Sequence, residues 1–288
     1  MIAYLKMNFL KICLVLFMSF WFISNATAEQ KLKFKKPVQY SKFKNVSNAV
    51  FLPSKELTKL TPAVVLLPVC SGIWEKTSGD YSRWAKTFTE NGYVVLIVDH
   101  YTRPGTFKSG CTLNRKVGEV QITKDLYDAV EYLSNIKNID KNRIFSLGFS
   151  LGSLANALAA SEKMDKRIGK GRLRPRAVGS LYGGCKFGDV ARFLFNDTNI
   201  PVIWLMASED KEVPPADCLE TLEEIRKKNK APIVWHIYEG ATHCWDCRAQ
   251  SGTVRTAHHN GVTSRYTYSE KFTKDSEKRV LDFFNSFK

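Results

Sequence analysis

Short runs of consecutive apolar residues recur along the chain from residue 62 onward, and amphipathic stretches separate them. The runs occupy residues 63–67, 93–98, 144–149, 177–182, 201–206 and 233–238. Continuous apolar runs rich in β-branched residues are typical of strands buried on both faces of a parallel sheet. These segments are therefore predicted to be the strands of a mostly parallel sheet.

The stretches between these runs have the apolar spacing of helices. Helices are predicted at residues 81–88, 118–136, 154–160, 218–228 and 275–287. Strands alternate with helices, and no fixed-period repeat, low-complexity tract or linker interrupts them, so we predict an α/β fold with a doubly wound sheet and helices on both faces. Residues 29–61 are polar and rich in lysine, and one or two exposed antiparallel strands at the sheet edge are expected there.

The start of the chain has a different composition. Lys6 and Lys11 lead into an apolar run over residues 12–23, and Ala26-Thr27-Ala28 has the spacing of a cleavage site. This combination is typical of a secretory signal, and the run is short for a bilayer span. We predict a signal peptide over residues 1–28, a single domain over residues 29–288, and export to the periplasm or the medium. An uncleaved membrane anchor is the alternative.

Basic residues outnumber acidic ones. Removal of residues 1–28, which hold two lysines and no acidic residue, lowers the formal net charge from +15 to about +13. This balance favours weak association with anionic surfaces or acidic substrates. Lysine and arginine are spread along the chain without an arginine-rich module, so we predict a solvated basic surface and no nucleic-acid partner. The densest basic stretch, residues 163–176, is predicted to be an exposed connection.

The cysteines that remain after cleavage are even in number: Cys70, Cys111, Cys185, Cys218, Cys244 and Cys247. In an exported chain this indicates disulfides, although the sequence does not choose among the possible pairings. Cys244 and Cys247 have the C-x-x-C spacing of a redox or metal pair. Because no second C-x-x-C exists, a structural disulfide is the favoured interpretation, and no metal site is predicted.

The apolar run 144–149 ends in Gly148-Phe149-Ser150-Leu151-Gly152, and a predicted helix follows. Strand, sharp turn and helix in this order are what a nucleophile elbow requires. The turn strains the backbone of Ser150 and exposes its hydroxyl, so the residues two positions before and after it must have almost no side chain. We predict Ser150 as a nucleophile, with an ordinary strand-to-helix turn as the alternative.

A serine hydroxyl needs a base that takes its proton and a third group that orients the base. In doubly wound sheets such groups lie in loops at the carboxyl ends of strands. Asp210 follows the predicted strand at 201–206, and His243 follows the one at 233–238. The chain order Ser150, Asp210, His243 is the serine, acid, histidine order of α/β hydrolases.

Other residues compete for these roles. Glu209 is the alternative acid, whereas Glu212 and Asp217 are interpreted as surface or helix-start residues. The remaining histidines are less well placed, since one lies within a strand, one ends an earlier strand and two lie in a late polar loop with no strand before them: His236, His100, His258 and His259. The predicted oxyanion donors are the N–H groups of Leu151 and Cys70, with Ser71 as the alternative to Cys70.

Several of these segments are similar to the dienelactone hydrolase family of α/β hydrolases: the elbow at 147–152, the acid loop ending at 214–218, the turn at 238–243 and the closing helix at 268–284. The resemblance covers most of residues 60–287. It implies a single-domain hydrolase without a cofactor, which acts on a small-molecule ester or lactone through an acyl-enzyme. It also implies that the loop at 99–105 lines the pocket, with Tyr101 and Arg103 as substrate-binding residues; an exposed structural arginine is the alternative for Arg103.

Two departures from the family pattern limit what the resemblance implies. Dienelactone hydrolases proper carry cysteine on the elbow where this chain has Ser150, so a muconate-pathway substrate is not inferred. Relatives with a serine elbow often show His-Gly where this chain has Pro68-Val69. A peptidase or acyltransferase using the same three residues, and an exported binding protein without catalysis, are the alternative functions. The substrate and the oligomeric state stay open.

Overall fold

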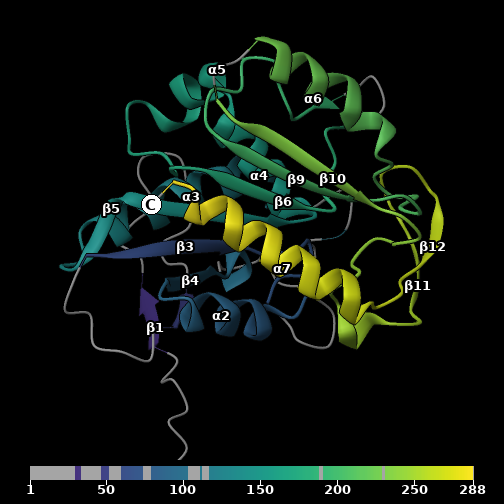
Figure 1. Ribbon diagram of the computed structural model, residues 1–288, viewed down its shortest axis with the longest axis horizontal. Coiled ribbons are helices and arrows are strands. Elements are labelled where there is room, and N and C mark those ends of the chain that lie inside the picture. Colours follow the sequence, from purple (N-terminus) through teal and green to yellow (C-terminus); the bar gives the residue numbers. More distant parts are fainter. Residues whose placement is uncertain are drawn as a thin grey trace, which may run out of the picture.

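A central sheet of eight strands organises the domain (Figure 1). The computed structural model describes residues 30–33, 47–51, 60–73, 79–102, 111, 117–187, 191–228 and 231–287, and the predicted signal peptide lies outside them. In spatial order the strands are β1 (Gln30–Lys33), β2 (Ser47–Phe51), β4 (Val94–Val98), β3 (Thr61–Leu67), β5 (Ile139–Phe149), β6 (Val178–Leu181), β9 (Val202–Ala207) and β10 (Ile233–Tyr238).

The strands from β4 to β10 are parallel to one another, whereas β1 and β2 add an antiparallel edge. The structure therefore confirms the mostly parallel sheet and the antiparallel strands expected before residue 61. Consecutive residues of β3 point to opposite faces, so that Val64 and Leu66 enter one hydrophobic core while Ala63, Val65 and Leu67 enter the other. A strand with a core on each side must be apolar throughout, which explains the continuous runs in the sequence.

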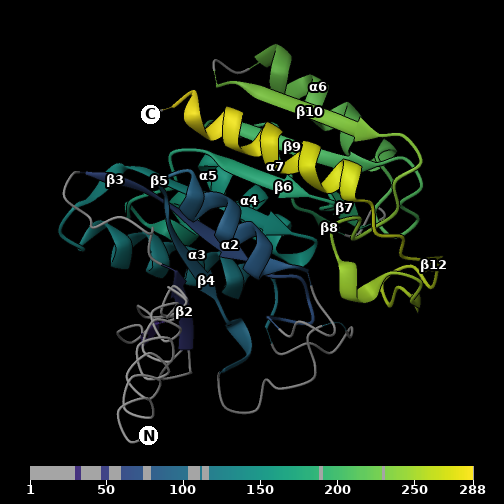
Figure 2. The same ribbon diagram turned by 60° about the horizontal axis from the view of Figure 1, so that its bottom comes forward.

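Helices cover both faces of the sheet, as predicted (Figures 1 and 2). One core contains side chains from α2 (Tyr81–Glu90) and α7 (Glu270–Asn285), and α7 crosses the front of the sheet in Figure 1. The other core contains side chains from α3 (Glu119–Ser134), α4 (Leu151–Ala160) and α6 (Ala216–Lys228). Every residue of α4 is buried, because this helix packs against both α3 and the sheet. No helix among the described residues is long and apolar enough to cross a membrane.

Several short elements complete the described part of the chain. A small two-stranded sheet joins β11 (Val254–Thr256) and β12 (Thr263–Arg265), beside the end from which α7 starts (Figure 1). A second one joins β7 (Lys186–Phe187) and β8 (Ala191–Arg192). The remainder are α5 (Glu162–Met164), a π-helical turn (Asp165–Gly169) and 3₁₀ turns at His100–Thr102 and Arg248–Gln250.

The basic stretch at 163–176 is not simply an exposed connection, so that prediction was wrong in part. Arg174 donates hydrogen bonds to the carbonyl oxygens of Ala159 and Ala160, which are unpaired within α4 because they end it. Arg172 pairs with Asp128 and with Glu131 of α3. These arginines connect the segment to α3 and to the end of α4.

The predicted disulfides are present. They join Cys70 to Cys111, Cys185 to Cys218 and Cys244 to Cys247. Each lies beside a loop at the carboxyl end of a sheet strand rather than inside the sheet.

The close approach of α4 to β3 gives a test of the fold. A Cβ atom at Gly152 would lie 2.1 Å from the carbonyl oxygen of Leu67, so Gly152→Ala must push the helix away from the strand. We expect this change to lower the free energy of unfolding by about 3 kcal/mol or more, measured by urea unfolding. Gly171→Asn is the control, because Gly171 has φ +82° but open space around it, and we expect a loss of about 1 kcal/mol. Equal unfolding midpoints for Gly152→Ala and the unaltered protein would contradict the argument.

Candidate active site

Ser150 occupies the sharp turn between β5 and α4. Its backbone has φ +49° and ψ −110°, an unfavourable conformation for a residue with a side chain. The Ser150 N–H donates to the carbonyl oxygen of Leu181 in the neighbouring strand β6, which holds the turn in place. A Cβ atom at Gly148 would lie 2.4 Å from the carbonyl oxygen of Gly152, so the turn closes only because residue 148 is glycine. The backbone thus has the elbow shape predicted from the sequence.

A chain of hydrogen bonds links Ser150, His243 and Asp210. His243 Nε2 lies 3.1 Å from Ser150 Oγ, and His243 Nδ1 lies 2.7 Å from Asp210 Oδ2. The second carboxylate oxygen, Asp210 Oδ1, accepts the N–H groups of Glu212 and Val213 at 2.9 and 3.0 Å. His243 and Asp210 are only 4% and 3% exposed. The loops after β5, β9 and β10 therefore bring the three predicted residues together, with the carboxylate aimed at one ring nitrogen and the hydroxyl at the other.

The competing histidines lie in different surroundings. His100 is buried and its Nδ1 lies 2.8 Å from Asp125 Oδ2. His236 lies within β10, as predicted. His258 and His259 follow β11, so the expectation that no strand precedes them was wrong.

Charge around the imidazole shifts its protonation equilibrium. Burial by itself lowers the pKa of His243, but the Asp210 and Glu212 carboxylates outweigh it and raise the pKa to about 9. A protonated imidazole cannot accept the serine proton. His243 therefore becomes able to accept it only as the pH rises and the imidazole loses its own proton. The raised pKa also stabilises the fold at pH values below the ordinary value of 6.5, and that contribution is lost as the pH rises through about 9.

A cavity of about 400 Å³ opens beside the Ser150 hydroxyl. Both predicted oxyanion donors line it: Leu151 begins α4, where its N–H has no acceptor within the helix, and Cys70 follows β3. The opposite wall comes from the β11–β12 hairpin and its tip, over residues 253–259. Apolar side chains such as Leu151, Leu154 and Val213 share the lining with several polar ones, which can fix the orientation of a small molecule.

The structure does not place either predicted substrate-binding residue at this cavity. Tyr101 is buried in the core that contains α3 and α4, and it is not part of the cavity lining. Arg103 lies outside the described residues. Their roles stay predictions.

Three residues near His243 were not identified from the sequence. Glu212, interpreted there as a surface residue, lines the cavity, and its Oε1 accepts the hydroxyl of Tyr266 at 2.6 Å. Tyr182 directly follows β6, between the strands that lead to Ser150 and Asp210. Its place at the carboxyl end of a parallel strand is the one signal that could have found it. Tyr266 follows β12, and no local pattern marks it.

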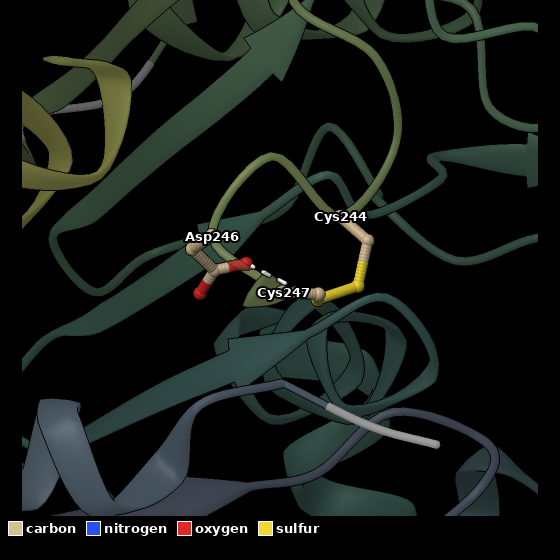
Figure 3. Close-up of side chains that lie close together, drawn as sticks. All are labelled: Cys244, Asp246 and Cys247. Carbon is tan, nitrogen blue, oxygen red and sulfur yellow. Dashed lines mark hydrogen bonds between the residues drawn. A yellow bond between two sulfur atoms is a disulfide. The ribbon is translucent and has the colours of Figure 1, made fainter. Parts of the chain in front are cut away.

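The C-x-x-C segment directly follows His243. Figure 3 shows Cys244 and Cys247 joined by a disulfide, with Asp246 beside them. Both sulfurs are bonded to each other, so in this state they are not thiolate ligands for a metal. The Asp246 carboxylate instead accepts Trp84 Nε1–H at 2.7 Å and the Tyr182 hydroxyl at 2.8 Å, and burial raises its pKa.

Comparison with known proteins identifies what the chain is similar to. The family model described as the dienelactone hydrolase family matches residues 48–288. An uncharacterized protein of Escherichia coli (strain K12), YcjY, is 27% identical over 140 residues, which are 48% of this chain and 43% of that protein. The chain therefore matches less than half the length of this curated relative.

Among solved structures, a putative dienelactone hydrolase from Klebsiella pneumoniae matches with a TM-score of 0.65 and 19% identity, covering 90% of this chain and 99% of that one. A dienelactone hydrolase-like promiscuous phosphotriesterase from metagenomic libraries matches with a TM-score of 0.63 and 12% identity, covering 90% and 98%. A thermophilic esterase from Thermogutta terrifontis matches with a TM-score of 0.59 and 12% identity, covering 89% of this chain and 91% of that one. At these identities the likeness shows the fold, and it confirms the predicted fold class.

The raised pKa of His243 can be measured without a substrate. In ring ¹⁵N–¹H NMR spectra recorded as a function of pH, we expect the resonance missing from His243→Ala to titrate well above 6.5, near 9, because two carboxylates stabilise the imidazolium. His236 is the internal control, since burial lowers its pKa below 6.5. A His243 resonance that titrates at or below 6.5 would rule out the electrostatic argument.

Proposed function

We propose that this chain, which belongs to the dienelactone hydrolase family, cleaves a small carboxylic ester or lactone through an acyl-enzyme on Ser150. The observation that carries this proposal is the hydrogen-bonded chain from Ser150 through His243 to Asp210 at the wall of the cavity. A serine on an elbow, a histidine within reach of its hydroxyl and a carboxylate on the far nitrogen are the parts that acyl transfer requires.

In the first half of the proposed reaction, His243 Nε2 takes the proton of the Ser150 hydroxyl while Ser150 Oγ attacks the ester carbonyl carbon. Asp210 keeps the proton on Nδ1 and stabilises the imidazolium that forms. The N–H groups of Leu151 and Cys70 hold the negative charge on the carbonyl oxygen, aided by the positive end of the α4 dipole. The imidazolium then gives its proton to the alcohol, which leaves with the electron pair of the broken C–O bond.

In the second half, His243 takes a proton from a water molecule, whose oxygen attacks the acyl carbon. The Ser150 ester bond breaks, Ser150 Oγ regains its proton from His243, and the carboxylic acid is released. For a lactone the alcohol and the acid are parts of one product, so the ring opens without loss of a fragment. No cofactor takes part in either half.

We also propose that the protein works outside the cytoplasm. Disulfides persist in oxidising compartments, and the chain carries three of them together with the signal-like segment at 1–28. Weak association of the basic surface with anionic surfaces stays a prediction.

The proposal predicts one activated serine. Incubation with a fluorophosphonate should add a single adduct to the protein, detected by intact mass, and Ser150→Ala should abolish both the adduct and ester hydrolysis. His243→Ala should lower both rates by about 10⁴-fold or more, because the hydroxyl then lacks its base. Asp210→Asn should also lower them strongly, since the imidazole is left in the wrong tautomer.

Two variants serve as matched controls. Ser82→Ala removes an exposed hydroxyl on α2, and His236→Ala removes an imidazole within β10, so both should label and hydrolyse at the rate of the unaltered protein. An adduct that survives in Ser150→Ala would refute the assignment, and a folded protein that never labels would favour a binding protein without catalysis. Labelling together with turnover of peptides in preference to esters would favour the peptidase alternative. Transfer of the acyl group to acceptors other than water would favour the acyltransferase alternative.

A further inference from the structure

The His243 imidazole contacts two tyrosine rings. The Tyr182 ring meets it edge to face, with ring centroids 4.9 Å apart and an interplanar angle of 62°. The Tyr266 ring contacts it with centroids 5.6 Å apart at 41°. Tyr182 follows β6 and Tyr266 follows β12, so the two rings come from parts of the chain that are distant in sequence. Two flanking rings leave the imidazole little freedom to rotate out of line with Ser150 and Asp210.

Each of these tyrosines is in turn anchored by a carboxylate. The Tyr182 hydroxyl donates to Asp246 Oδ1 at 2.8 Å, and the Tyr266 hydroxyl donates to Glu212 Oε1 at 2.6 Å. Hydrogen bonds from neutral hydroxyls to carboxylates are stronger than those between neutral groups. The two anchors therefore fix the rings more firmly than packing alone.

The carboxylates are themselves tied to other elements. Asp246 is completely buried and also accepts Trp84 Nε1–H from α2 at 2.7 Å. Glu212 Oε1 also accepts Ser264 Oγ–H from β12 at 3.1 Å. Among the described residues no lysine or arginine forms an ion pair with Asp246, so its charge is stabilised by neutral donors alone. Such a buried carboxylate costs free energy that an apolar side chain would not, which points to a role beyond stability.

Backbone strain accompanies this arrangement. Tyr182 has φ +40° and Cys244, directly after His243, has φ +59°. Left-handed backbone at residues other than glycine is unfavourable and is held only where the surrounding structure determines it. Here it accompanies the turn that packs the Tyr182 ring against the imidazole and the turn that begins the C-x-x-C loop.

We propose that Asp246 and Glu212 are positioning residues for His243, each holding through its tyrosine one side of the imidazole in line with Ser150 and stabilising the imidazolium that forms during acyl transfer. The inference rests on the proposed function, because it assigns His243 the role of base. The titratable groups that face His243 among the described residues are Asp210 and Glu212 from the loop after β9, Asp246 from the loop after β10, and the two tyrosines.

The two parts of this role can be separated by substitution. Asp246→Asn and Glu212→Gln remove a negative charge and keep an oxygen acceptor for the tyrosine. They should therefore lower the midpoint of the kcat–pH profile by about 1 pH unit. Tyr182→Phe and Tyr266→Phe keep both charges and both rings but remove the anchor. They should lower kcat by about 10-fold or more without moving the midpoint to lower pH.

The control variant is Tyr127→Phe. It removes a tyrosine–carboxylate hydrogen bond of the same kind, from Tyr127 to Asp165 at 2.5 Å, on an element that carries no group of the site. We expect its kcat and its midpoint to equal those of the unaltered protein. Thermal melting of every variant shows whether it is folded. If Asp246→Asn does not fold, Glu212→Gln and the two tyrosine variants still test the positioning role.

The NMR titration of His243 is repeated in each variant, because it does not depend on turnover. Midpoints of folded Asp246→Asn and Glu212→Gln that match the unaltered protein, or tyrosine variants with unchanged kcat, would overturn the inference. A protein that neither labels nor hydrolyses esters would instead remove the proposed function. A lowered NMR midpoint in the charge variants would then show that the carboxylates act on His243 while its role as base was wrong.

Discussion

The left-handed backbone of Ser150 is the constraint on which the rest of the site depends. That conformation reverses the chain so sharply that α4 begins directly against β3, and the contact is possible only because Gly152 has no side chain to meet the Leu67 carbonyl oxygen. The same reversal brings the first N–H groups of α4 to the end of β3, where Cys70 follows. One turn therefore exposes the hydroxyl and places beside it the N–H groups that we propose as donors for the developing charge.

The order of strands in the sheet does the remaining assembly. Cys70, Ser150, Tyr182, Asp210 and His243 each follow a strand, and those strands are the consecutive neighbours β3, β5, β6, β9 and β10. Parallel strands end at the same edge, and neighbouring strands lie about 4.8 Å apart, so groups distant in sequence arrive within reach of one another. Positive φ values recur along this edge at Ser150, Tyr182 and Cys244. At these three positions the unfavourable backbone belongs to the turns that surround His243.

The fold and the three residues linked by hydrogen bonds could be predicted because their signals are local. A buried parallel strand must be apolar, and an elbow must carry glycine on both sides of its serine. The surroundings of His243 carry no such signal. In the sequence Glu212 resembles any charged loop residue, and its contact with Tyr266 exists only because β12 packs beside it. Asp246 likewise meets its partners only when α2 and the turn after β6 pack against its loop. The pairing of the cysteines depends on the same tertiary placement, as does the hairpin that forms a cavity wall.

The disulfides differ in what they contribute. The bridges from Cys70 to Cys111 and from Cys185 to Cys218 span 41 and 33 residues, so each removes much of the freedom of the unfolded chain and adds to global stability. The Cys244–Cys247 bridge spans only 3 residues, and the loop that it closes is too short for this entropy to be large. Its main effect is local: it restricts the segment that begins at His243 and contains Asp246. The short bridge therefore acts on the geometry around His243 more than on the stability of the domain.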